Sequence, residues 1–74
     1  MKSKAMIGLQ EYELPVVIQE DESGGYVATC PLWKDAYAQG ETIEKATTEL
    51  SQVILALVKV YQEEHLLIPL FFSH

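Results

Sequence analysis

The chain has 74 residues and a formal net charge of −6, with 49% hydrophobic and 22% charged residues. A chain this short buries only about 60% of the surface that it exposes when unfolded, so we expect one small domain (residues 1–74) with a thin core. The acidic charge argues against direct binding to DNA or RNA, because such binding depends on Lys and Arg side chains that neutralise phosphates.

The first elements are an N-terminal extension and a strand. We expect residues 1–10 to be loosely ordered. Apolar and polar residues alternate over residues 12–19, which predicts a half-buried strand. Pro15 cannot donate a hydrogen bond to a neighbouring strand, so this strand lies at a sheet edge or begins its pairing after Pro15. One face of the strand carries Tyr12, Leu14, Val16 and Ile18.

A hairpin and two further strands follow. Residues 20–25 are rich in acidic residues and end in two glycines, which adopt positive φ angles without a Cβ clash, so they predict a turn. Residues 26–30 are rich in strand formers and stop at Pro31, which predicts an antiparallel partner for the first strand. We expect a loop over residues 31–35 and a short third strand over residues 36–39.

One long helix is expected next, with Thr42 as its N-cap and its end near Glu63. Apolar residues recur with the helical period, which indicates that one face packs on the sheet. Leu55 lies among the polar residues of the other face. The apolar arc contains Ile43, Ala46, Leu50, Val53, Ile54, Leu57, Val58, Val60 and Tyr61.

Residues 66–72 predict a final strand, in which Pro69 is tolerated at a sheet edge. The expected fold is therefore of the α+β class, in the order β-β-β-α-β, with one long helix on one face of a small sheet. This last apolar run is too short to span a bilayer, and the chain shows no secretory signal pattern. We expect a cytoplasmic protein that binds no membrane.

The chain shows no motif for catalysis, metal binding or cofactor binding. Cys30 stands alone before Pro31, which favours a small core residue over a nucleophile. His65 and His74 have no accompanying residues at the spacing of a metal site. We therefore expect no enzyme activity, no metal and no cofactor.

Candidate contacts with a partner or a second subunit lie in three places. The acidic hairpin tip, Glu20, Asp21 and Glu22, is a solvated turn or a contact surface. Trp33 either folds back over the sheet to enlarge the core or inserts into a partner, and the sequence favours neither. Leu55 is either an isolated exposed leucine or a subunit contact.

Turn and packing residues carry a resemblance to a known family. They are Gly24-Gly25-Tyr26-Val27-Ala28, then Pro31, then Gln39-Gly40-Glu41-Thr42, and Glu44 to Ala46. At these spacings the chain resembles the HicB family of antitoxins over roughly residues 12–64. It departs from the family at residues 33–36, where family members usually have a Leu-Pro-Gly-Cys type sequence.

The resemblance implies a partial ribonuclease-H-like fold without nuclease carboxylates. It also implies a protein that oligomerises and sequesters a small basic toxin of the HicA type, which cleaves messenger RNA. Longer members carry a C-terminal DNA-binding segment that these 74 residues lack, so we expect no direct operator binding. The alternative is an orphan HicB-like domain that acts as a homo-oligomeric accessory or small-molecule-binding protein. We expect a homodimer or higher oligomer in either case, because a small core gains from added buried area.

Overall fold

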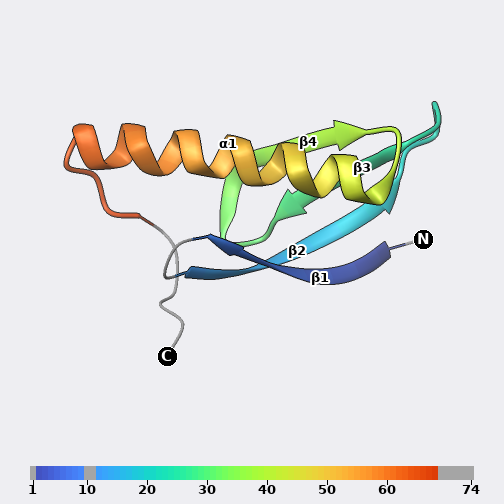
Figure 1. Cartoon of the computed structure of the whole chain (residues 1–74), viewed down its shortest axis with the longest axis horizontal. Helices are drawn as coiled ribbons and strands as arrows, with labels where there is room; N and C mark the ends of the chain where they lie inside the picture. The colour runs from blue at the N-terminus through green and yellow to red at the C-terminus, as the bar shows by residue number, and fades with distance from the viewer. Residues whose placement is uncertain (1, 10–11, 69–74) are drawn as a thin grey trace.

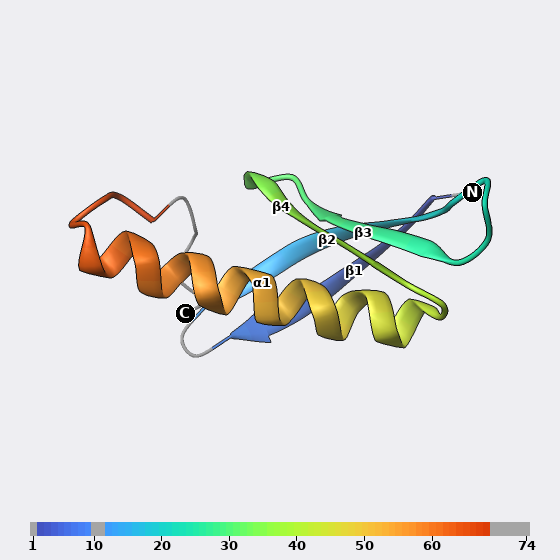
Figure 2. The ribbon, with the colours of Figure 1, turned by 90° about the horizontal axis from the view of Figure 1, so that it is seen from above.

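A computed structural model describes residues 2–9 and 12–68 of the protein. The strands form one antiparallel sheet in the order β1-β2-β3-β4, and the helix lies across one face of this sheet (Figure 1). Seen from above, the helix crosses the strands obliquely (Figure 2). The α+β class with one long helix on a small sheet is confirmed. The elements are β1 (Lys2–Leu9), β2 (Tyr12–Glu20), β3 (Tyr26–Cys30), β4 (Trp33–Gly40) and α1 (Ile43–Glu63).

Strand β1 corrects the sequence analysis, because a loosely ordered extension over residues 1–10 is wrong for Lys2–Leu9. β1 pairs with β2 along its whole length, from Lys2 opposite Gln19 to Leu9 opposite Tyr12. Its signal in the sequence is weak. Ala5, Ile7 and Leu9 turn toward the core, but Ala5 is small and Leu9 is the one buried residue among the three.

Strand β2 lies in the interior of the sheet, between β1 and β3. The edge position considered for Pro15 is therefore wrong, and the second alternative, in which pairing begins after Pro15, holds toward β3 but not toward β1. Pairing with β3 begins at Val17, opposite Thr29, so Pro15 precedes it and faces Met6 of β1. The missing amide donor of Pro15 thus interrupts no part of the pairing between β2 and β3.

Strand β4 begins earlier than expected, at Trp33, so the predicted loop over residues 31–35 is correct for residues 31–32 and wrong for residues 33–35. Only two residues connect β3 to β4, since Cys30 pairs with Trp33. The pairing register between β3 and β4 shifts at this point: Cys30 pairs with Trp33, but its neighbour Thr29 pairs with Tyr37. Residues 34–35 are both exposed and lie between two buried residues, Trp33 and Ala36. Extra residues in one strand interrupt the regular alternation of buried and exposed side chains in this way. This irregularity hid the start of β4 in the sequence.

Helix α1 begins as predicted, with the Thr42 hydroxyl accepting a hydrogen bond from the Lys45 amide at 3.0 Å. It ends in a turn at His65, whose φ of 58° lies in the left-handed region. The Leu66 amide donates to the Tyr61 carbonyl at 2.8 Å, and the His65 amide donates to the Gln62 carbonyl at 3.3 Å, the pair that closes a Schellman motif.

The expected final strand begins just after this turn. Residues 66–68 are not in a strand, and residues 69–72 lie outside the described part of the chain. From Tyr12 to Glu63, the order of three strands and a helix is confirmed.

The core lies between α1 and one face of the sheet. Alanines on β3 and β4 face the helix, which brings the helix axis close to the sheet. The packed stripe of α1 is narrower than predicted, because Ile43 and Val60 are exposed. Cys30 is buried, as expected of a small core residue. The buried residues are Leu9, Leu14, Val16, Ile18, Ala28, Cys30, Trp33, Ala36, Ala38, Ala46, Leu50, Ile54 and Val58.

Trp33 lies in this core and is only 3% exposed. Its ring meets the ring of Tyr61 edge to face, with the centroids 4.8 Å apart. Its indole N–H is buried without a hydrogen-bond partner among the described residues. The first of the two interpretations of Trp33, an enlarged core, therefore describes the folded chain.

Gly40 marks the closest approach between the sheet and the helix. A Cβ atom at this position would lie 2.5 Å from the Ala46 amide nitrogen and 2.8 Å from the Lys45 carbonyl carbon. Both are backbone atoms, so a side chain here would displace the first turn of α1. Glycine is needed at position 40 because the backbone of α1 leaves no room for a side chain there.

We predict that Gly40→Ala lowers the free energy of unfolding by about 1–3 kcal/mol, the usual cost of forcing atoms into a packed site. Gly8→Ala is the matched control, because a Cβ there meets nothing within 4 Å. It should leave stability unchanged or raise it by up to about 1 kcal/mol. Urea unfolding at one protein concentration measures both. Equal losses in the two variants would contradict the close approach.

We also predict that Trp33, the single tryptophan, emits at short wavelength in the folded protein and resists quenching by acrylamide. Trp33→Phe should cost about 1–2 kcal/mol of stability, less than the 3–5 kcal/mol typical of Trp33→Ala, because Phe fills most of the site and removes an unpaired donor. Fluorescence and urea unfolding test this. Efficient quenching in the folded state would contradict the core position.

Candidate functional site

The candidate functional site among the described residues is a charged surface. Within residues 2–9 and 12–68, no three His, Cys, Asp or Glu side chains are grouped so as to hold a metal ion. The helix that the structure describes is not apolar enough over its length to cross a membrane. The feature that stands out is charge: six of the eleven acidic residues gather at one end of the fold. We call this surface the acidic end; it comprises Glu20, Asp21, Glu22, Glu41, Glu44 and Glu49.

The hairpin between β2 and β3 supplies half of the acidic end. The Asp21 amide donates to the Gly25 carbonyl and the Gly24 amide donates to the Asp21 carbonyl, both at 3.0 Å. Gly24 and Gly25 have φ angles of 97° and 81°, which only glycine adopts readily. The Ser23 hydroxyl donates to the Asp21 carboxylate. This turn holds Asp21 in place.

The start of α1 supplies the other half. A Cβ on Gly25 would lie 2.8 Å from the Gly40 carbonyl oxygen, so the hairpin and the end of β4 are in close contact. Glu41 follows Gly40 directly, and Glu44 lies in the first turn of the helix. Two glycines thus bring acidic residues from separate parts of the chain together.

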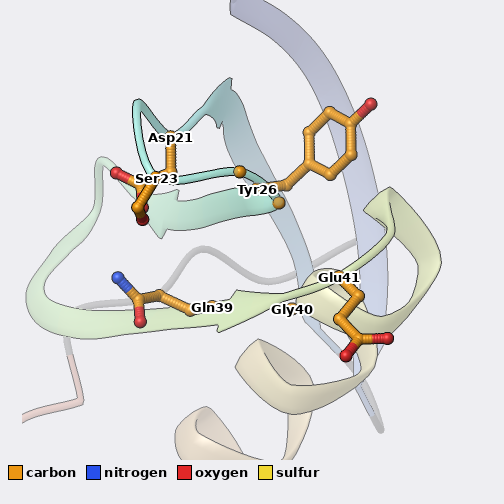
Figure 3. A pocket seen from close by; sticks show the side chains of 8 residues that line it. Asp21, Ser23, Tyr26, Gln39, Gly40 and Glu41 are labelled. Carbon is orange, nitrogen blue, oxygen red and sulfur yellow. The ribbon is translucent and has the colours of Figure 1, made fainter.

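Two adjoining hollows show that the acidic end is continuous. The first, of about 260 Å³, lies between the hairpin and β4, with Asp21 and Ser23 on one side and Gln39 and Glu41 on the other (Figure 3). The second, of about 610 Å³, also touches Gln39 and Glu41 and extends along α1. Its further lining residues are Gly40, Glu44, Lys45, Thr48 and Glu49.

The electrostatic character of the acidic end follows from this lining. Lys45 is the one cation that lines either hollow within the described residues, and it pairs with Glu41 at 3.6 Å. Both side chains of this pair are largely exposed, so the pair contributes little stability and offsets only part of the negative charge. The acidic end can therefore attract a cationic partner over several ångströms of solvent.

The other predicted contact residues lie elsewhere. Trp33 begins β4, at the strand end far from Gly40, and is buried. Leu55 lies on the outer side of α1 and is 40% exposed. The structure thus brings Glu20, Asp21 and Glu22 together with residues of α1, but not with Trp33 or Leu55.

Two features were missed from the sequence. Glu41, Glu44 and Glu49 join the hairpin only through the contact between Gly25 and Gly40, which no local pattern reveals. The second feature is a hollow of about 370 Å³ on the sheet face opposite α1, lined mainly by apolar residues of β1 and β2. It depends on β1, which was not predicted.

Comparison with known proteins gives relatives but no structural match. No protein-family model matches the chain, and no solved structure matches it. A UPF0150 protein of Synechocystis is 32% identical over 60 residues, which cover 81% of this chain and 76% of the relative. A second UPF0150 protein of that organism is 37% identical over 46 residues, covering 62% and 67%. A third is 40% identical over 47 residues, covering 64% and 65%. The chain therefore belongs to the UPF0150 family.

Proposed function

We propose that the protein is an antitoxin of the HicB type, which binds a small basic toxin of the HicA type and prevents it from cleaving messenger RNA. One observation carries the proposal: the fold gathers six carboxylates, from the hairpin, from Glu41 and from α1, onto the acidic end. The class of partner comes from the resemblance at residues 24–28 and 39–42. The proposed place of action is the cytoplasm, and the protein itself performs no reaction.

The physical argument is competition for a basic surface. A ribonuclease holds its substrate with Lys and Arg side chains that contact phosphates. A group of carboxylates offers the same cations an alternative partner, and the net charge of −6 speeds the encounter. Because the hairpin turn and the capped helix already order the backbone that carries these groups, little backbone ordering is needed on binding.

A second candidate function is an oligomeric accessory domain, or a small-molecule-binding domain, without a toxin partner. The observation that favours it is the apolar hollow on the sheet face opposite α1, whose volume of about 370 Å³ is within the usual range of ligand pockets. Under this alternative, the acidic end keeps the protein soluble and binds no specific partner.

The direct experiment is co-expression with any small basic protein encoded beside this chain. Complex formation and RNA cleavage are then measured at low and at moderate salt, since exposed charges are screened by salt. A complex that cleaves no RNA supports the antitoxin. Absence of a complex at both salt concentrations would exclude it and favour the second function.

We predict that Glu20→Gln/Glu22→Gln weakens toxin binding about fivefold to tenfold at low salt, since exposed ion pairs contribute about 0.2–1 kcal/mol each. The loss should shrink at moderate salt. Titration calorimetry gives both affinities.

Glu63→Gln/Glu64→Gln is the matched control, because it removes the same charge from exposed residues at the far end of α1. Its affinity should stay within about twofold of the unmodified protein. If both double variants weaken binding equally, net charge acts without a defined site and the acidic end is not the binding surface.

A further inference from the structure

The sheet face opposite α1, which we call the open face, carries a group of apolar residues among polar ones. Its polar residues are Lys2, Lys4, Glu13, Gln19, Thr29 and Gln39. Strand register places Lys4, Val17, Thr29 and Tyr37 in one row across all four strands, and none of these side chains is in the core. Met6 and Tyr37 are 61% and 62% exposed. In an antiparallel sheet with one face in water, outward positions are usually polar. The apolar residues of the open face are Met6, Pro15, Val17, Val27, Pro31 and Tyr37.

The part of this face formed by β1 and β2 is hollowed. Met6, Pro15, Val17 and Pro31 line a space of about 370 Å³, with Lys4 at its rim. Contiguous exposed apolar surface of this kind marks an interaction site in soluble proteins. No described residue of α1 reaches it, because the helix occupies the opposite face (Figures 1 and 2).

We propose that the open face binds the open face of a second copy of this chain. The charges at its two ends support this partner. Lys2 and Lys4 lie at one end of the ribbon formed by β1 and β2, and Glu13 lies at the other end, opposite Gly8. A two-fold axis that runs between the two sheets and crosses the strands at their middle reverses the strand direction of the second copy.

This arrangement is self-complementary. The lysine end of each copy lies over the glutamate end of the other, and the apolar centres, with Val17 and Pro15, meet around the axis. A contact of this kind closes on itself and gives a dimer.

A basic protein fits the open face poorly. Of the residues that strand register places on it, two are lysines and one, Glu13, is acidic. The acidic end, on different residues, suits such a partner better. Self-association and the proposed toxin binding therefore use different residues.

The available area sets the strength of the contact. Four strands about 4.8 Å apart, with about 3.3 Å per residue over the length of β1, give a footprint on the order of 500 Å². Side chains that stand out of the sheet add to this accessible area. Standard interfaces bury about 800 Å² per partner, so the open face supports a modest, concentration-dependent dimer.

The test is sedimentation equilibrium of the full chain, from low micromolar to near-millimolar protein. The unmodified chain should pass from monomer to dimer in this range. Val17→Lys and Met6→Lys should each raise the dissociation constant at least tenfold. Leu55→Lys, the control on the outer side of α1, should leave the constant unchanged. Circular dichroism checks that each variant is folded.

A charge exchange tests the orientation without adding bulk to the apolar centre. Glu13→Lys alone should weaken the dimer severalfold, and Glu13→Lys combined with Lys4→Glu should restore it. A chain that is monomeric at every concentration overturns the proposal. So does a dimer that Leu55→Lys disrupts as strongly as Val17→Lys, and a charge exchange that restores nothing overturns the two-fold arrangement. Toxin binding is measured separately, and Val17→Lys should retain it, so the two proposals fail independently.

Discussion

The close approach of the β4 backbone to the first turn of α1, at Gly40, is the constraint on which the rest of the structure depends. Only Glu41 and Thr42 separate the strand from the helix, so the chain must turn at once and lie back on the sheet. With no side chain at Gly40, Ala46 packs fully against β4 and sets the start of a buried stripe that recurs every four residues. Gly25 of the hairpin packs closely against the Gly40 carbonyl oxygen. Close packing at Gly40 therefore positions both the core and the acidic end.

A single helix of this length covers one face of a four-stranded sheet and leaves the other face open. Carboxylates gather around the hairpin and the start of α1, and Lys2 and Lys4 lie on the β1 residues nearest the hairpin, with their register on the open face. The two surfaces therefore suit different partners: the acidic end suits a cationic one, and the open face suits an apolar one with charges at its ends.

Local patterns were enough to predict β2, β3, α1 and the cap at Thr42, because each has a regular period or a specific capping residue. They failed where tertiary structure decides. β1 pairs with β2, but its outward Met6 is apolar while its inward Ala5 is small, so the alternation is blurred. The predicted strand over residues 36–39 was shorter than β4, because two exposed residues follow Trp33 and hide the start of the strand. The hairpin acids were identified from the sequence, but their neighbours on α1 were not, since they meet only through glycines that lie far apart in the chain.

The run from Leu14 to Ile18 is best understood from both faces of the sheet. Leu14, Val16 and Ile18 fill the core, which agrees with a half-buried strand. The intervening residues, Pro15 and Val17, are also apolar and lie on the open face. An uninterrupted apolar run in an interior strand is typical of sheets covered on both sides. If the second cover is another copy of the chain, each copy completes a second core for the other. The stability of so small a domain then rises with its own concentration, because association favours the folded state by mass action.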